Sequence, residues 1–177
     1  MSGAMRGHGQ DCACCGKPVE GPVSDFGCQL PDVAFEKYKS RAALPRSQGV
    51  VDGNICIYQG RFYIYALVAV SCDVCDEFRF GVWVDVGHIR DKVTWGKFLK
   101  YVDTFDSPEY MTQDFVGVLA NYLALFPEAK GKRVWFKPKK NDAKPYVYNC
   151  DDPEMKEAIM NGWTREQYEA ALKVLMP

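Results

Sequence analysis

The fold is constrained most by two long apolar segments that follow one another closely, residues 61–72 and 77–87. The first, RFYIYALVAVSC, is rich in the β-branched and aromatic residues that favour strands. The second, EFRFGVWVDVG, alternates: its even-numbered positions from 78 to 86 are apolar, whereas Trp83 and Asp85 lie on the opposite face. The short link between them predicts an antiparallel hairpin with Cys72-Asp73-Val74-Cys75 at its tip.

Five helices are predicted from apolar spacing and from end signals. They cover residues 30–44, 88–103, 115–126, 153–161 and 164–175. The fourth has the clearest frame, with Asp152 as N-cap, Pro153 at the first helical position and Gly162 past the end. The last opens with a capping box, Thr164 to Gln167. The side chains of the second helix that are predicted to face inward are Ile89, Val93, Phe98, Tyr101 and Val102.

The remaining ordered segments are predicted strands. Residues 55–58 follow the turn signal Asp52-Gly53, and residues 131–140 and 144–150 form a second hairpin. The order of elements therefore predicts an α+β fold with a mostly antiparallel sheet, packed by helices on one face. Residues 1–10 are expected to be a disordered tail, and residues 11–177 a single domain.

Charge and hydropathy bear on the partners and the cellular location expected for the chain. The formal net charge is -1, which does not call for nucleic acid or an anionic membrane as a partner. No apolar run approaches the roughly 20 residues of a membrane helix. The first ten residues lack the apolar core of a secretory signal, so a cytoplasmic location is expected.

In that compartment the eight cysteines are not expected to pair as disulfides. Two Cys-x-x-Cys pairs, Cys12–Cys15 and Cys72–Cys75, supply four thiolates, and that set predicts one tetrahedral zinc. Such a site leaves no open position for water or substrate, so the zinc would be structural.

Other ligand sets stay open. The alternative metal ligands are Cys14, Cys28 and His8. Cys56 and Cys150 also fit buried strand positions, and a set of reduced thiols without metal is the plain alternative. A redox disulfide is disfavoured because neither pair stands between a strand and a helix.

A basic and aromatic stretch is the second candidate site. Seven Lys and Arg residues lie between Lys130 and Lys144. Strand alternation separates an inner set from an outer set, and the predicted outer binding surface consists of Arg133, Trp135, Lys137, Lys139 and Lys140. Single-stranded nucleic acid favours such a mixture. The alternatives are a protein partner and a solvated hairpin whose lysines protect a sheet edge.

No catalytic motif is present: the chain has no phosphate-binding Gly-rich loop, no Gly-x-Ser-x-Gly and no His-Glu-x-x-His. An enzyme with Cys14 or Cys28 as nucleophile stays an alternative, although no neighbouring base is indicated.

Several ordered segments resemble a bacterial family known as domain of unknown function twenty-one ninety-nine. They are CACCG, SDFGCQLPD, DGNICIYQGRFYIYALVAV, FGVWVDV, FVGVLANYLALFP and DDPEMKEAIMNGWTREQ. The resemblance runs from about Cys12 to the C-terminus and implies a cysteine knuckle at Cys12 and Cys15. It does not include the Cys72–Cys75 pair, so the resemblance makes Cys56 a rival metal ligand. The family usually has His-Pro where this chain has Asp152-Pro153, so an enzyme that used that histidine would be inactive here.

Taken together, these features predict a non-enzymatic, cytosolic bacterial zinc-binding protein that acts by binding another protein. The narrowest form of this prediction is an immunity-type protein that neutralises a toxin. The alternatives are a nucleic-acid-binding zinc module that uses the Lys130–Lys144 hairpin and an enzyme with a cysteine nucleophile.

Overall fold

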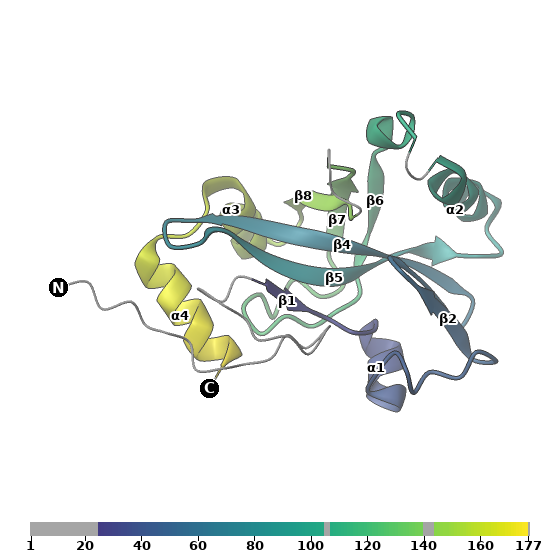
Figure 1. Ribbon diagram of the computed structural model, residues 1–177, viewed down its shortest axis with the longest axis horizontal. Helices are drawn as coiled ribbons and strands as arrows, with labels where there is room; N and C mark the ends of the chain where they lie inside the picture. The colour runs from purple at the N-terminus through teal and green to yellow at the C-terminus, as the bar shows by residue number, and fades with distance from the viewer. Residues whose placement is uncertain (1–24, 105–106, 140–143, 177) are drawn as a thin grey trace.

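The computed structural model describes residues 25–104, 107–139 and 144–176, which form an α+β fold as predicted (Figure 1). The strands are β1 (Asp25–Gly27), β2 (Gly49–Asp52), β3 (Ile55–Tyr58), β4 (Arg61–Cys72), β5 (Asp76–His88), β6 (Phe115–Leu119), β7 (Arg133–Lys137) and β8 (Tyr146–Cys150). The helices are α1 (Asp32–Tyr38), α2 (Lys92–Thr104), α3 (Pro153–Asn161) and α4 (Arg165–Leu175), with a short 3-10 turn, η1, at Tyr110–Thr112.

The β4–β5 hairpin is the axis of the sheet. The two strands pair along their whole length, from Arg61 opposite His88 to Cys72 opposite Asp76, which confirms the predicted hairpin. Each strand also uses its second edge twice: β4 pairs with β3 and then β8, and β5 pairs with β1 and then β6. Because β6, β7 and β8 pair in turn, strands β4 to β8 close into a five-stranded barrel.

Most strand pairs are antiparallel, as predicted, but two are parallel. They are β1 with β5 and β4 with β8. The second of these pairs closes the barrel by joining Val68 to Val147, two residues far apart in the sequence. β1 was not predicted at all.

The two faces of β4 and β5 bury different cores. The barrel interior holds the alternate apolar residues of the hairpin, from Phe62 to Val70 and from Phe78 to Val84, packed against α3 through Met155. The opposite side of the hairpin carries Trp83 and a set of tyrosines, which α1 covers through Ala34. Helices therefore pack at several sides of the sheet, and the prediction that they share one face is wrong.

The helix predicted over residues 115–126 is also wrong. Its first part is strand β6, which fills the gap in the barrel between β5 and β7. Gly117 permits this close approach, because a Cβ there would lie 2.6 Å from the carbonyl oxygen of Asp85. The apolar spacing of FVGVL fits a strand as well as a helix, and tertiary pairing decided between them.

Helices α1 and α2 differ from their predictions in where the helix ends and in which side chains are buried. α1 ends at Tyr38 rather than near residue 44, because Lys39 takes a left-handed conformation with φ 63°. In α2 the inward stripe consists of Thr94, Phe98 and Tyr101. Val93 and Val102, predicted to face inward, are 64% and 44% exposed. The end signals of α3 and α4 are confirmed.

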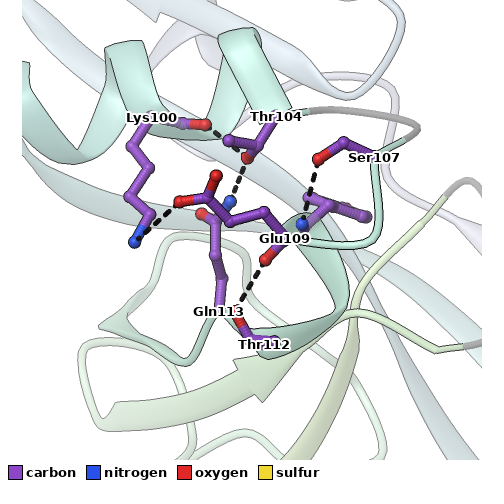
Figure 2. Close-up of polar contacts among 7 residues, drawn as sticks. Lys100, Thr104, Ser107, Glu109, Thr112 and Gln113 are labelled. Atoms are coloured by element: carbon purple, nitrogen blue, oxygen red, sulfur yellow. Dashed lines mark hydrogen bonds and ion pairs between the residues drawn. The ribbon is translucent and has the colours of Figure 1, made fainter.

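A cluster of polar contacts joins the end of α2 to η1 (Figure 2). Gln113 Nε2 donates to Thr104 Oγ1, and that hydroxyl donates to the carbonyl oxygen of Lys100 at 2.6 Å. Lys100 Nζ lies 3.6 Å from Glu109 Oε1. These short-range contacts fix the approach to β6, so the cluster has a structural role.

No helix among the residues described here is both long and apolar enough to cross a lipid bilayer.

Candidate functional site

The tip of the β4–β5 hairpin carries one of the two predicted cysteine pairs. Cys72 is buried and Cys75 is half-buried, and the two lie on either side of the turn at Asp73-Val74. The amide of Val74 donates to Cys72 Sγ at 3.4 Å. A hydrogen bond from a backbone amide to a cysteine sulfur orients that sulfur as a metal ligand.

The tip is fastened to the corner between α3 and α4. The amide of Trp163 donates to the carbonyl oxygen of Ser71 at 2.7 Å, and the amide of Asp73 donates to the carbonyl oxygen of Trp163. Gly162 makes the turn possible, because its φ is +73° and a Cβ would lie 2.7 Å from the Ser71 oxygen. Figure 1 shows the tip beside both helices.

A groove of about 680 Å³ lies in this corner. Its charged lining residues are all acidic: Asp73 from the hairpin tip, and Glu154 and Glu157 from α3. Its aromatic lining residues are Phe126 and Trp163, whose rings stack with centroids 6.3 Å apart. The groove therefore combines an aromatic wall with one sign of charge.

Half of the predicted zinc set can be placed. Cys72 and Cys75 lie together, whereas Cys12, Cys15 and the alternatives Cys14 and His8 lie outside the described residues. Within the described residues no three His, Cys, Asp or Glu side chains are grouped to hold a metal ion. A zinc at the tip would need its remaining ligands from the N-terminal segment.

The alternative ligands Cys28 and Cys56 lie elsewhere in the fold. Cys56 pairs with Tyr63 near the start of β4, so at about 3.3 Å per residue it lies roughly 30 Å along the strand from Cys72. Cys28 follows β1, and its amide donates to the carbonyl oxygen of Gly81 in the middle of β5. Neither thiol can share a metal ion with the hairpin tip.

Burial makes both of these thiols poor nucleophiles. Burial raises the pKa of Cys28 to about 12, and the nearby Asp32 carboxylate adds to the shift. Burial also raises the pKa of Cys56 to about 12. A catalytic cysteine needs a lowered pKa, so the environment of Cys28 weighs against the nucleophile alternative at that residue.

The predicted basic surface lies on the outside of the barrel. Arg133, Trp135 and Lys137 point outward from β7, while Val134 and Phe136 are fully buried, so the predicted alternation is confirmed. Lys139 is exposed just after the strand, and Lys140 lies outside the described residues. We call the outward side of β6, β7 and β8 the outer face.

The outer face includes exposed apolar side chains. Val116 and Val118 of β6 are 41% and 39% exposed, and Val116 lies directly opposite Trp135. Exposed faces of antiparallel sheets normally carry polar residues. Exposed apolar side chains that lie side by side are one feature of interaction surfaces.

Cations lie over the aromatic rings of this face. Arg133 stands 5.4 Å from the Trp135 ring centroid, Lys137 stands 5.0 Å from that of Tyr148, and Lys139 stands 4.1 Å from that of Tyr146. Carboxylates accompany them: Arg133 Nε lies 2.8 Å from Asp151, and Lys139 Nζ lies 3.4 Å from Glu77. Much of the positive charge is thus compensated within the protein.

The structural role of the buried Asn121 was not predicted from the sequence. Asn121 is 1% exposed; its Oδ1 accepts from the amide of Trp83, and its Nδ2 donates to the carbonyl oxygen of Leu30 and to Asp32 Oδ1. These bonds fasten the start of α1 to β5. The sequence carried no signal for it, because its partners lie about 40 and 90 positions away.

Comparison with known families gives a match over residues 11–161 to an uncharacterized protein family conserved in bacteria (DUF2199). The chain belongs to the DUF2199 family. A comparison with curated proteins gave no match, and neither did a comparison with solved structures. The DUF2199 match confirms the resemblance found in the sequence and includes the hairpin tip, the outer face and α3. Trp163 and α4 follow the matched residues.

Proposed function

We propose that this DUF2199 protein acts by binding another protein through its outer face. The observation that carries the proposal is an outward apolar row made of the exposed Val116 and Val118 and the half-buried Trp135. Alternation places this row on the outside of a sheet whose inner residues already fill the core. Trp, Tyr and Arg are the residues that contribute most to protein interfaces, and Arg133 and Tyr148 adjoin this row.

The composition of the outer face favours protein over nucleic acid. Nucleic acid binding draws its affinity from uncompensated positive charge that displaces counterions. Here Arg133 is paired with Asp151, and Tyr148 donates to the Asp114 carboxylate at 2.9 Å. A mixed apolar and charge-paired surface suits the core and rim of a protein interface.

Affinity capture with the purified protein as bait tests this proposal. The baits are the wild-type chain, Trp135→Ala, and Trp95→Ala as a matched control, because Trp95 is an exposed tryptophan on α2. We expect a protein that is retained after nuclease treatment, survives Trp95→Ala and is lost with Trp135→Ala. Capture that nuclease abolishes, or that Trp135→Ala leaves unchanged, would contradict the proposal.

A structural zinc at the hairpin tip forms a second part of the proposal. Cys72 and Cys75 would supply two thiolates, and Cys12 and Cys15 the other two. The donor set fits, because thiolates are the preferred ligands of structural zinc and Cys72 Sγ already accepts the Val74 amide. The metal would join the N-terminal segment to the groove corner.

Metal content by mass spectrometry of the native protein tests the zinc. We expect one zinc per chain, lost in both Cys12→Ser and Cys72→Ser and retained in Cys150→Ala, whose buried thiol ends β8. Absence of zinc from the wild-type chain, or its retention after Cys72→Ser, would show that the hairpin tip is not the site.

Toxin neutralisation is the narrower form of the protein-binding proposal. An immunity-type protein acts by covering a partner, which requires a preformed surface and no catalytic group of its own. The outer face supplies such a surface, since its side chains stand on strands that the barrel core holds in place. Identification of the captured protein as a toxin, and loss of protection with Trp135→Ala, would support it.

A further inference from the structure

We propose that the groove between the hairpin tip and the α3–α4 corner binds an arginine side chain of a partner protein. The inference deepens the proposed function and rests on it only in taking the partner to be a protein. It concerns a different part of the surface from the outer face, so the two can fail separately.

The groove is a preformed cavity with a rigid aromatic wall. The Trp163 ring lies 5.1 Å from Phe78 and 5.9 Å from Phe80, both of which are core residues of β5. It also stacks with Phe126 across the groove wall. With its main chain bonded to Ser71, the indole is held in place while part of it stays exposed to the groove.

The electrostatics of the groove select a cation. Asp73, Glu154 and Glu157 line it, and no Lys or Arg belongs to its lining. Asn161 Nδ2 donates to Glu157 Oε1 at 2.6 Å, which orients that carboxylate and leaves Oε2 able to accept from an entering donor.

The N-terminus of α4 lies beside the groove, but it does not form an anion-binding site there. Its capping box satisfies two of the terminal amides internally, since Thr164 Oγ1 accepts from the amide of Gln167 and Gln167 Oε1 accepts from that of Thr164. An anionic ligand would therefore meet three carboxylates and few available donors.

Arginine fits the groove better than lysine or a neutral group. A guanidinium is planar, so it can lie against the part of the Trp163 indole that lines the groove and at the same time donate to the lining carboxylates. An ammonium lacks that geometry and is more costly to dehydrate. The combination of a fixed aromatic wall with carboxylates at its rim is thus specific for the guanidinium.

A titration of isotope-labelled full-length protein with N-acetyl-arginine methylamide, followed by NMR at the Trp163 indole, tests the assignment. The neutral analogue N-acetyl-citrulline methylamide and N-acetyl-lysine methylamide serve as comparison probes. We expect saturable binding with a dissociation constant on the order of millimolar, about ten-fold weaker for citrulline and several-fold weaker for lysine. Glu157→Gln should weaken arginine binding by about ten-fold.

Glu169→Gln is the matched control, because it removes the same charge from an exposed position of α4 outside the groove lining. It should leave arginine binding unchanged. Equal binding of arginine and citrulline, equal binding of arginine and lysine, or no effect of Glu157→Gln would overturn the inference. If arginine fails to bind while Trp135→Ala still abolishes capture, the inference falls and the proposed function stands.

Discussion

The outer face and the groove differ in how they relate to the core. The outer face is formed by alternate residues of β6, β7 and β8, whose neighbours Phe115, Val134 and Phe136 are buried. The groove is formed by residues that also hold the fold together, such as Trp163, which packs on Phe78 and Phe80. At the outer face, strand alternation therefore assigns binding and core packing to different residues. In the groove the same residues serve both.

Phe136→Ala should have the largest effect on stability. Its side chain is fully buried and stacks on Phe115 with centroids 5.3 Å apart. Removing it should lower the free energy of unfolding by about 4 kcal/mol through lost burial and a cavity. Urea denaturation measures this, and a loss below about 1.5 kcal/mol would contradict the assignment of Phe136 to the barrel core.

Trp163→Ala should come next, with a loss of about 2–3 kcal/mol, because this side chain is half-buried but contacts three core aromatic rings. The same variant should lose the arginine binding proposed for the groove. Unfolding by urea and the NMR titration report the two effects. Wild-type stability in this variant would mean that the groove, like the outer face, is independent of the core.

Lys139→Ala should have the smallest effect. The Lys139–Glu77 pair is largely exposed, with side chains 50% and 36% accessible, so solvent screens it. A double-mutant cycle with Glu77→Ala should give a coupling energy below about 0.5 kcal/mol. A coupling above about 1 kcal/mol would show that the charges on the outer face are structural rather than available to a partner.

Local signals in the sequence predicted a large part of the fold. The alternation in residues 77–87 predicts a strand, and the caps at Asp152 and Thr164 predict the starts of two helices. All three predictions are confirmed. The apolar run at residues 115–119 has no such signal, since its spacing suits a helix or a strand. Pairing with β5 and β7 decided it, and those contacts are distant in the sequence.

The outer face could be predicted from the sequence and the groove could not, because only the outer face has a local sequence signal. The outer face follows from alternation within β7, so Arg133, Trp135 and Lys137 could be assigned to one side from sequence alone. The groove depends on bringing Asp73 beside Glu157 and Trp163, about 90 positions later in the chain. These residues are brought together by barrel closure and by the backbone hydrogen bond between Trp163 and Ser71. Neither has a local sequence signal.

The most direct test of the outer face compares two adjacent residues of β7 in one pair of measurements. Trp135→Ala should weaken binding to the captured partner by about 2 kcal/mol, roughly 30-fold, while lowering the free energy of unfolding by less than about 1 kcal/mol. Phe136→Ala supplies the opposite case, a large loss of stability at the neighbouring inward position. Unchanged affinity in Trp135→Ala, measured by calorimetry at matched fraction folded, would contradict the outer face as the binding surface.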